Sequence, residues 1–482
     1  MRASHLLLPA ALCVGCLAPD PDELRPELDE LIRGGLPDAW AGPSGAEGAV
    51  ADRPFWETFG DATLDQLVVE ALEHNQDLVA SAERLRAAAA RSMVARSARS
   101  PQIQGRVDGS RQDQTFVGFP LFPGPLESEY DQWSAAIDLS WELDLWGKLA
   151  AGVDAAEAEV EAVRADVAAA RLSVAAQVAI TWFGLREAAE QVALAEATVD
   201  TYERSLKVVR DRSELGLAGS LDLKLSQANV AGSRAQLSRV TRARDVVARQ
   251  LEVLLGRYPE ADLRSEGGFD GLPPAVPAGI PADVLARRPD MVSLERRMAS
   301  AEAAARQARL DRWPSVALTA SGGLTNEDLQ GILDGDFSIW SLAGRVTAPL
   351  VDGGRREARI DESLATLREV RARFASAALR AFFEVENALA AEVRIAERLR
   401  FLEEAARLSE EATALADDQY TRGLVSIELV LEAQRRELQA RSAFLETRRE
   451  LFQNRVDLHV ALGGGFGGEV VGGATPVGAE AP

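Results

Sequence analysis

The sequence predicts an α+β fold made of two tandem structural repeats, each combining a two-strand hairpin with very long antiparallel coiled helices. Three observations lead to this prediction: an internal repeat, apolar residues spaced by seven, and short stretches in which apolar and polar residues alternate. The repeat is visible in the glycines, because Gly423 follows Gly216 by 207 positions and Gly463 follows Gly256 by the same number. A unit of this size repeated twice is a pseudo-symmetric building block rather than a solenoid of many short repeats.

The composition excludes some classes of protein. Of the 482 residues, 53 are Lys or Arg and 75 are Asp or Glu, which gives a net charge of −22. Nucleic acid is therefore an unsuitable partner, because phosphate binding needs a basic face. The acidity has two interpretations, simple solubility or a surface that attracts cations. Aromatic residues make up 6% of the chain, which suits long close-packed helices better than a large aromatic core.

The first residues, MRASHLLLPAALCVGC, predict an export signal over 1–15, since one Arg is followed by a short apolar run and small residues. The string before Cys16 is similar to a bacterial lipobox, so we expect Cys16 to be lipidated; the alternative is a signal that is cleaved without lipidation. Residues 16–60 are then an extended, lipid-anchored arm. No later segment reaches 18 consecutive apolar residues, which predicts no transmembrane helix. A chain of this kind crosses a membrane only as a closed barrel.

The repeats begin with a helix and a hairpin. Leu64–Ala98 has helical spacing, and Asp61 is positioned to cap it. Alternation then predicts two hairpins, at 102–142 and 315–349. In the fourth strand the apolar residues Ile339, Leu342 and Val346 alternate imperfectly. Several Trp residues flank the strands and form either an aromatic girdle at a membrane interface or ordinary strand-end packing: Trp133, Trp141, Trp146, Trp313 and Trp340.

A very long helix follows each hairpin. Val153, Val160, Val167 and Val174 are seven residues apart, which indicates a coiled-coil seam. A helix of about 65 residues is a rod on the order of 100 Å long. The predicted boundaries are: repeat 1 over 61–256 with long helix 147–215 and return helix 220–256; linker 257–280; repeat 2 over 281–463 with long helix 353–422 and return helix 426–462; flexible tail 464–482.

Four strings in this order carry a family resemblance: WELDLWGK at Trp141–Lys148, LARRPD at Leu285–Asp290, APLVDGGRR at Ala348–Arg356 and YTRGLVSIELVLEAQ at Tyr420–Gln434. Over essentially the whole chain, the layout resembles the TolC-type outer-membrane efflux proteins, and most of all their lipoprotein (OprM-like) branch. The resemblance implies a homotrimer in the outer membrane, with a shared 12-stranded β-barrel and a periplasmic α-barrel of long helices. Independently, four strands per chain are too few to close a water-filled barrel.

The function implied by the resemblance is a passive exit channel of a tripartite efflux system. A periplasmic adaptor and an inner-membrane transporter are the implied partners, and small molecules such as drugs or toxic compounds are the implied cargo. Two alternatives remain open: the outer-membrane component of a protein secretion system, and a periplasmic coiled-coil scaffold without a pore. We expect no enzyme activity and no cofactor, since the sequence lacks the H-E-x-x-H, P-loop and G-x-S-x-G motifs. The few His and Cys residues also predict no metal site.

The return turns are the predicted functional site. Gly216, Gly219 and Gly423 are expected to supply the left-handed backbone that a reversing helix needs. The resemblance makes the same turns the docking point of the adaptor. Aligning the family on these glycines places its periplasmic gate on Asp222, Tyr420 and Glu432, and the resemblance implies a bond between Tyr420 and Asp222.

Glu428, one helical turn before Glu432, is an additional gate candidate. Three-fold symmetry would gather three copies of each carboxylate around the axis and attract cations. The alternatives are that Glu428 and Glu432 form an i, i+4 pair on a solvated face, and that Tyr420 is ordinary packing. The family's interhelical Arg falls on Val425 here, so we expect the lock to be weaker or differently built.

Overall fold

The computed structural model describes residues 40, 54–116, 126–265, 268–269, 271, 276, 281–334 and 337–464. The predicted signal, Cys16, most of the arm, much of the linker and the tail beyond Gly464 lie outside the described residues. The described chain forms two compact units. We call Ala87–Glu161 with Glu295–Ala375 the sheet unit. We call the described parts of Leu36–Arg86, Ala162–Leu294 and Ser376–Pro482 the helix unit.

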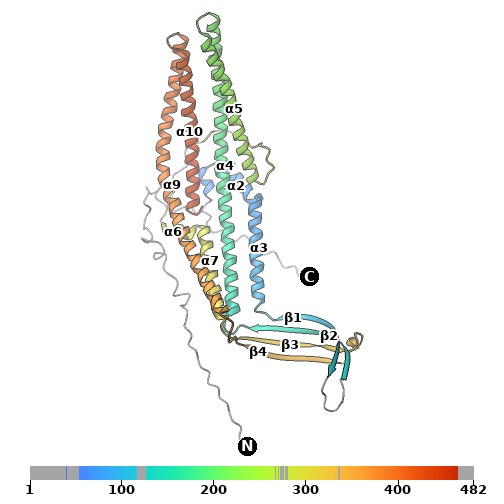
Figure 1. The fold of residues 1–482 in the computed structure, drawn as a ribbon. Coiled ribbons are helices and arrows are strands. Elements are labelled where there is room, and N and C mark those ends of the chain that lie inside the picture. Colours follow the sequence, from blue (N-terminus) through green and yellow to red (C-terminus); the bar gives the residue numbers. More distant parts are fainter. Residues whose placement is uncertain are drawn as a thin grey trace. The chain divides into compact units, whose positions relative to one another are not determined.

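The sheet unit contains one antiparallel sheet in the order β1-β2-β3-β4 (Figure 1). Its strands are β1 (Gln102–Phe116), β2 (Leu126–Leu143), β3 (Ser315–Asn326) and β4 (Ser338–Thr347). The hairpins of the two repeats are joined because β2 pairs with β3. A short helix that the alternation did not predict, α8 (Gly331–Asp334), lies between β3 and β4.

The register gives this sheet one apolar and one polar face. Ile137 pairs with Gly322, and Leu139 pairs with Ala320, whereas the next pair, Ser140 with Thr319, belongs to the opposite face. On β4 the register assigns Trp340, Leu342 and Val346 to the apolar face. Ile339 belongs to the polar face, which explains why the predicted alternation was imperfect. Large apolar side chains stay exposed on the apolar face, with Trp340 82% exposed. An apolar face without a cover marks an interaction surface.

Each strand pair leads into a long helix through a similar junction. The Asp144 carboxylate accepts hydrogen bonds from the first N–H groups of α4 (Lys148–Glu214). Asp352 caps α9 (Arg355–Thr421) in the same way. The Trp146 and Trp313 rings stack with centroids 5.2 Å apart, so these two tryptophans of the sheet unit pack against each other.

The helix predicted over Leu64–Ala98 is two helices, and the prediction of one was wrong. The structure has α2 (Ala62–His74) and α3 (Gln76–Ser97). The break is at Asn75, whose backbone is extended and whose side-chain oxygen accepts from the N–H groups of Asp77 and Leu78. As predicted, Asp61 caps α2. The corresponding helix of repeat 2 is likewise divided, into α6 (Pro281–Arg287) and α7 (Pro289–Leu310).

Both breaks contact the end of a return helix. The return helices are α5 (Ser220–Leu254) and α10 (Ile427–Ala461). Asn75 Nδ2 donates to the Leu254 carbonyl at 2.9 Å, and Arg288 Nη1 donates to the Ala461 carbonyl at 3.2 Å. Leu254 and Ala461 are 207 positions apart. The repeat is therefore one of tertiary contacts as well as of sequence.

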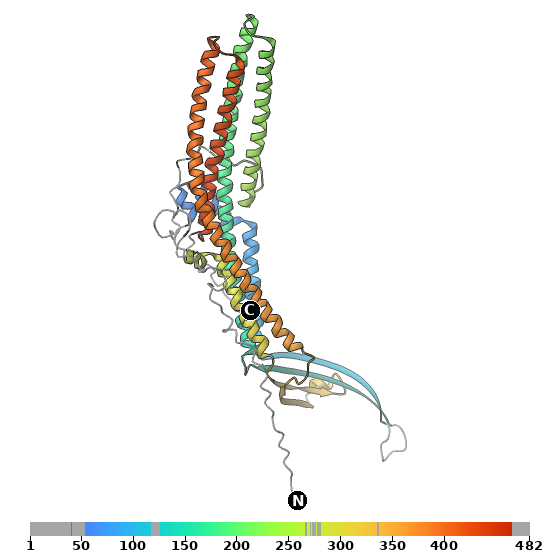
Figure 2. The same cartoon turned by 60° about the vertical axis from the view of Figure 1, so that its left-hand side comes forward.

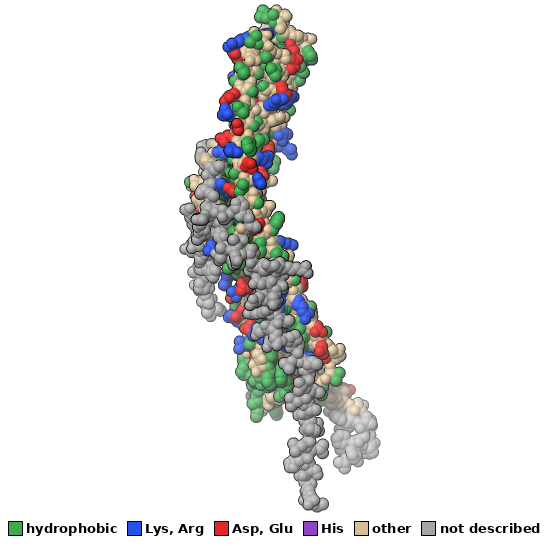
Figure 3. All heavy atoms as spheres, turned by 90° about the vertical axis from the view of Figure 1, so that its left-hand side faces the viewer, with side chains coloured by type: hydrophobic (Ala, Val, Ile, Leu, Met, Phe, Trp, Pro, Cys, Tyr) green, Lys and Arg blue, Asp and Glu red, His purple; other side chains and the backbone are tan. Residues whose placement is uncertain are grey.

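The core of the helix unit is aromatic where the short helix η2 (Phe55–Phe59) meets α4 and α10. Phe183 of α4 and Phe452 of α10 lie with ring centroids 4.8 Å apart. Figure 2 shows two pairs of long helices, α4 with α5 and α9 with α10, continuing past this region to their return turns. Along the face in Figure 3, acidic and basic side chains are interspersed, so the net charge is not gathered into one patch there.

One segment of α4 resembles a membrane-spanning helix in length and composition. A window of 18 residues within α4 is long and apolar enough to span a membrane by length and composition, and 44% of it is buried inside the chain. The window includes polar residues, so the criterion of consecutive apolar residues did not find it. The core helix of a protein passes the same test, so a single window of this kind does not by itself indicate a membrane span.

His459 provides a prediction of pH dependence. Its ring stacks on Phe55 at 5.8 Å and its Nε2 lies 3.3 Å from Thr58 Oγ1. Burial, and then the nearby Arg455, lower the pKa of His459 from 6.5 to about 4. Below pH 6.5 the unfolded chain binds a proton at His459, whereas the folded chain binds it only near pH 4, so acid favours unfolding. The free energy of unfolding is therefore unaffected above pH 6.5 and falls as the pH drops to about 4, in all by about 3 kcal/mol at roughly 1.4 kcal/mol per pKa unit.

We therefore expect the backbone amides of η2 to exchange faster at pH 4.5 than at pH 7, after correction for intrinsic rates. His459→Phe removes the titrating group and should abolish this difference. Hydrogen-exchange mass spectrometry measures it, with His74→Gln as the control, because His74 is exposed. A His459→Phe variant that keeps the full pH dependence would contradict the assignment.

Candidate functional site

The two return turns, where α4 meets α5 and α9 meets α10, share one backbone geometry. Gly216 has φ 73° and Gly423 has φ 76°. Leu217 N–H donates to the Arg212 carbonyl at 2.8 Å, and Leu424 N–H donates to the Gln419 carbonyl at 2.9 Å. This hydrogen-bond pattern, closed by a left-handed glycine, is a Schellman motif. The predicted left-handed backbone is confirmed at these two glycines.

The prediction of a left-handed backbone was wrong for Gly219. Its φ is −79° and its ψ is 162°, because it is the residue that precedes α5 as its N-cap. Its N–H donates to the Asp222 carboxylate at 3.0 Å. A Cβ on Gly219 would meet only Asp222 Oδ2, at the ordinary contact distance of 3.8 Å. Ser426 is the corresponding N-cap of α10.

These glycines allow a matched prediction. Gly216→Ala and Gly423→Ala place a Cβ on a left-handed residue, which costs roughly 1–2 kcal/mol each. Gly219→Ser supplies a preferred N-cap residue and should be neutral or slightly stabilising. Thermal melts of the three purified variants, followed by circular dichroism, measure this. Equal losses in all three would contradict the assigned turn geometry.

The four gate candidates have different surroundings. Asp222 lies in the first turn of α5, where its charge interacts favourably with the helix dipole. Glu428 lies in the first turn of α10, and hydrogen bonds from the Ser426 hydroxyl and from its own backbone N–H lower the pKa of Glu428. Glu432 forms ion pairs with Arg435 and with Arg436, the latter at 2.8 Å. In the expected acidic ring, the charge of Glu432 is therefore partly neutralised by arginines of its own helix.

Tyr420 lies in the apolar cluster between the turns. Burial raises the pKa of Tyr420; the Arg212 guanidinium opposes this, while the carboxylates of Asp222 and Glu428 add to it. Of the four gate candidates, Asp222 and Glu428 are thus close enough to Tyr420 to influence its ionisation, whereas Glu432 is not among the groups that do so. The bond between Tyr420 and Asp222 that the family resemblance implies is not formed in the part of this chain that the structure describes. Among the described residues of this single chain, Asp222 accepts from Gly219, and no hydrogen bond joins it to the Tyr420 hydroxyl.

Arg212 is the residue at this site that sequence reasoning missed. Its guanidinium carbon lies 4.8 Å from the centre of the Tyr420 ring. Its Nη1 donates to the Tyr420 carbonyl at 2.9 Å. A basic residue in the last turn of a helix is common, so the pattern did not reveal that Arg212 reaches a different helix end.

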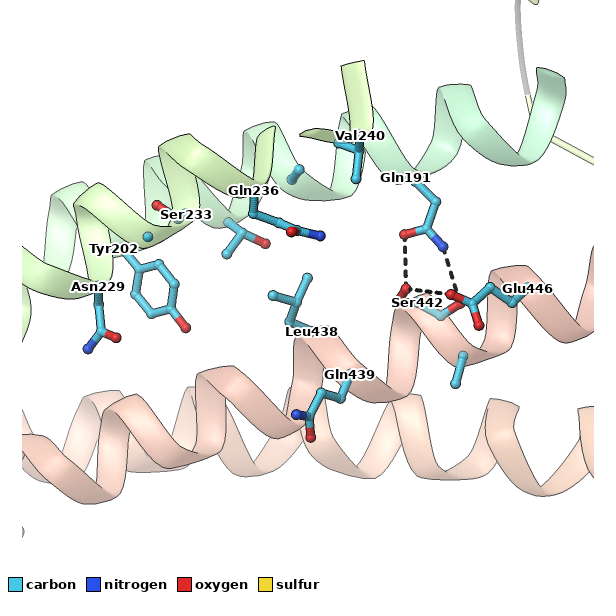
Figure 4. A pocket seen from close by; sticks show the side chains of 14 residues that line it. Gln191, Tyr202, Asn229, Ser233, Gln236, Val240, Leu438, Gln439, Ser442 and Glu446 are labelled. Atoms are coloured by element: carbon cyan, nitrogen blue, oxygen red, sulfur yellow. Dashed lines mark hydrogen bonds between the residues drawn. The ribbon is translucent and has the colours of Figure 1, made fainter. Parts of the chain in front are cut away.

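A cavity of about 420 Å³ lies further along the same helices, between α4, α5 and α10 (Figure 4). At one end of it, the Ser442 hydroxyl donates to Gln191 Oε1 at 3.1 Å. Gln236, Gln439 and Tyr202 are among the side chains that line it. Within the part of the chain that the structure describes, no group of three or more His, Cys, Asp or Glu residues is arranged to hold a metal ion.

The fold defines a class of protein: a chain of two tandem repeats that share one four-stranded antiparallel sheet and carry long paired helices. The family model for outer membrane efflux proteins matches residues 67–257 and 280–464. The chain belongs to this family, and it is an outer-membrane exit channel whose helices extend into the periplasm. The predicted α+β class with two tandem repeats is confirmed, as is the recognised family. It is a family of channels rather than of enzymes.

Named relatives agree with this membership. The toluene efflux pump outer membrane protein TtgF of Pseudomonas putida is 31% identical over 415 residues, covering 85% of each chain. The pyoverdine export outer membrane protein OpmQ of Pseudomonas aeruginosa is 28% identical, covering 95% of this chain and 96% of the relative. The solved structure of the outer-membrane channel OprN has a TM-score of 0.81 at 26% identity, covering 89% of this chain and 98% of that chain.

Proposed function

We propose that three copies of this chain close one 12-stranded barrel in the outer membrane and continue as a hollow periplasmic duct of long helices. The observation that supports this best is the sheet. It has one exposed apolar face, one polar face and four strands, and β1 and β4 each pair with one described strand only. A barrel whose outer face is apolar and whose inner face is polar needs this alternation.

The partners in this proposal are a periplasmic adaptor and an inner-membrane transporter. Leu215, Leu217 and Leu424 at the return turns are 74%, 66% and 71% exposed. Exposed apolar side chains at helix ends suit docking of another helical protein. The turn glycines Gly216, Gly219 and Gly423 shape this docking surface. The cargo is small organic molecules such as solvents and antibiotics, in line with the names of relatives, and the transporter selects among them.

The N-terminal arm completes the proposal. We infer that Cys16 becomes the first residue of the mature chain and carries the lipid that anchors it. Intact mass spectrometry of the purified protein tests this: a lipidated Cys16 adds the mass of its acyl chains, and Cys16→Ser removes that mass. A mature chain of unmodified mass would support cleavage without lipidation.

Complementation tests the export function. A strain deleted for this gene should become sensitive to toluene-like solvents or to antibiotics, and the full chain should restore resistance only when an adaptor and a transporter are present. The purified protein should conduct ions in planar bilayers. A well-folded trimer that neither conducts nor restores resistance would favour the scaffold without a pore.

The gate is the testable part of the duct. We place it at the return turns, with Asp222, Glu428 and Glu432 as its acidic side chains and Tyr420 as the ring that packs behind them. Asp222 allows charge and capping to be separated: Asp222→Asn keeps a cap acceptor without the charge, whereas Asp222→Ala removes both. We expect both variants to lower the permeability ratio of K⁺ to Cl⁻ by roughly a few-fold.

Bilayer recordings measure this ratio, with Glu196→Gln as the control. Glu196 is an exposed carboxylate of α4 at a distance from the turns. If Asp222→Asn behaves as the wild type and only Asp222→Ala differs, Asp222 acts as a helix cap and the gate charge lies elsewhere.

A further inference from the structure

Arg212 connects the two return turns of one chain. It belongs to the last turn of α4, in repeat 1. Its Nη1 donates to the carbonyls of Tyr420 and Thr421, at 2.9 Å and 3.5 Å, at the end of α9 in repeat 2. Those carbonyls are at the negative end of the α9 dipole, where a cation is stabilised. The same guanidinium covers the Tyr420 ring, which adds a cation–π contact.

An apolar cluster lies beside this partly buried contact. Val209 of α4 is fully buried in a cluster with Ala416, Ile427 and Val430. A second polar contact lies about two helical turns away, where Gln434 Nε2 donates to Ser205 Oγ at 3.1 Å. Both contacts join the α4–α5 hairpin to the α9–α10 hairpin. Within the described helix unit, the two hairpins are thus fastened near their turns by an apolar cluster with polar contacts at its edge.

The contact does not follow from the repeat. A shift of 207 positions takes Arg212 to Gln419 and takes Ser213 to Tyr420. Gln419 has no charge, and Ser213 has no ring on which a cation could stack. The pairing of an arginine with a tyrosine therefore occurs in one direction, from repeat 1 to repeat 2. It is a feature of this chain's two different halves.

We propose that Arg212 is the positioning residue that holds the two return turns of one chain at a fixed separation. This role rests on the proposed function, because the separation of the turns sets the aperture of the duct. Losing Arg212 frees each turn to move independently, which widens the range of apertures that this end of the duct samples.

The test is a distance measurement within one chain. Spin labels on cysteines replacing Leu217 and Leu424, both exposed, report the separation of the turns by pulsed electron paramagnetic resonance. Labelled chains are diluted with unlabelled chains so that intramolecular distances dominate. Arg212→Ala should broaden the distance distribution, while Arg210→Ala should leave it unchanged, since Arg210 is exposed on the same helix turn. Hydrogen exchange of the amides in 418–431 should become roughly tenfold faster in Arg212→Ala, as expected for a lost charged hydrogen bond.

A conservative variant separates the loss of the contact from a general loss of folding. Arg212→Lys retains the charge at the end of α9 but not the planar donor pair, so its distribution should lie between those of wild type and Arg212→Ala. A narrow distribution in Arg212→Ala overturns the positioning role, whatever the channel conducts. A broadened distribution with unchanged single-channel conductance supports the positioning role and overturns the placement of the gate at the return turns.

Discussion

Alanine at Gly256 is expected to cost the protein about 3 kcal/mol or more of stability, since it combines backbone strain with a steric clash. Gly256 has φ 73°, a left-handed conformation. A Cβ there would lie 2.6 Å from the His74 carbonyl oxygen, which is backbone and cannot rotate away. The contact is the one between the α2–α3 break and the end of α5, so the clash would separate two elements that Asn75 joins.

The same helix offers a matched control. Gly232 is an exposed residue in the interior of α5, and no described atom lies within 4 Å of a Cβ built on it. Gly232→Ala should therefore stabilise α5 by about 0.5–1 kcal/mol. In repeat 2, Gly463→Ala should be damaging but less so, because the closest atoms of Arg287 are at 3.1 Å. Melting temperatures of the trimers in detergent should decrease in the order Gly232→Ala, wild type, Gly463→Ala, Gly256→Ala. Equal melting of Gly256→Ala and wild type would contradict this packing.

Gly256 also illustrates what the sequence predicts well. The 207-residue spacing of Gly256 and Gly463 marks the C-terminal ends of α5 and α10. A helix that stops abruptly often ends in a left-handed residue, which favours glycine. The long helices are similarly legible: 147–215 was predicted and α4 spans Lys148–Glu214. A seven-residue seam without proline specifies a continuous helix along its whole length. Such signals are local, and the residues that carry them are adjacent on one helix face.

The misassigned residues depend on contacts between distant segments. Asn75 interrupts a helix without changing the apolar spacing on either side, and its side chain is held by the Leu254 carbonyl. Gly219 is a helix N-cap, and composition alone does not distinguish an N-cap glycine from a C-terminal one. Arg212 contacts a helix end more than 200 positions away. No spacing within α4 contains that information, so the return turns could be located from the sequence, whereas the contact that joins them could not be identified.

Alanine at Gly323 is expected to prevent normal assembly of the strands, whereas alanine at the adjacent Gly322 is expected to be tolerated. A Cβ on Gly323 would lie 2.2 Å from the Ala135 carbonyl oxygen and 2.7 Å from Ala136 Cα, both backbone atoms of β2. A Cβ on Gly322 would have no described atom within 4 Å. The two glycines are neighbours on β3 and their side chains would face opposite sides of the sheet.

The pair therefore tests the register of β2 against β3, which decides which residues belong to the apolar face and which to the polar face of the sheet. A slip of one residue would exchange the roles of Gly322 and Gly323 and would turn the apolar face inward. Heat-resistant trimer in outer-membrane extracts measures assembly, and we expect it to be retained in Gly322→Ala and lost in Gly323→Ala. The reverse result would mean that β3 is shifted by one residue. Because β2–β3 pairing joins the two repeats into one sheet, that shift would move every side chain of one hairpin to the opposite face of the sheet, and the outward apolar face of the proposed barrel would be lost.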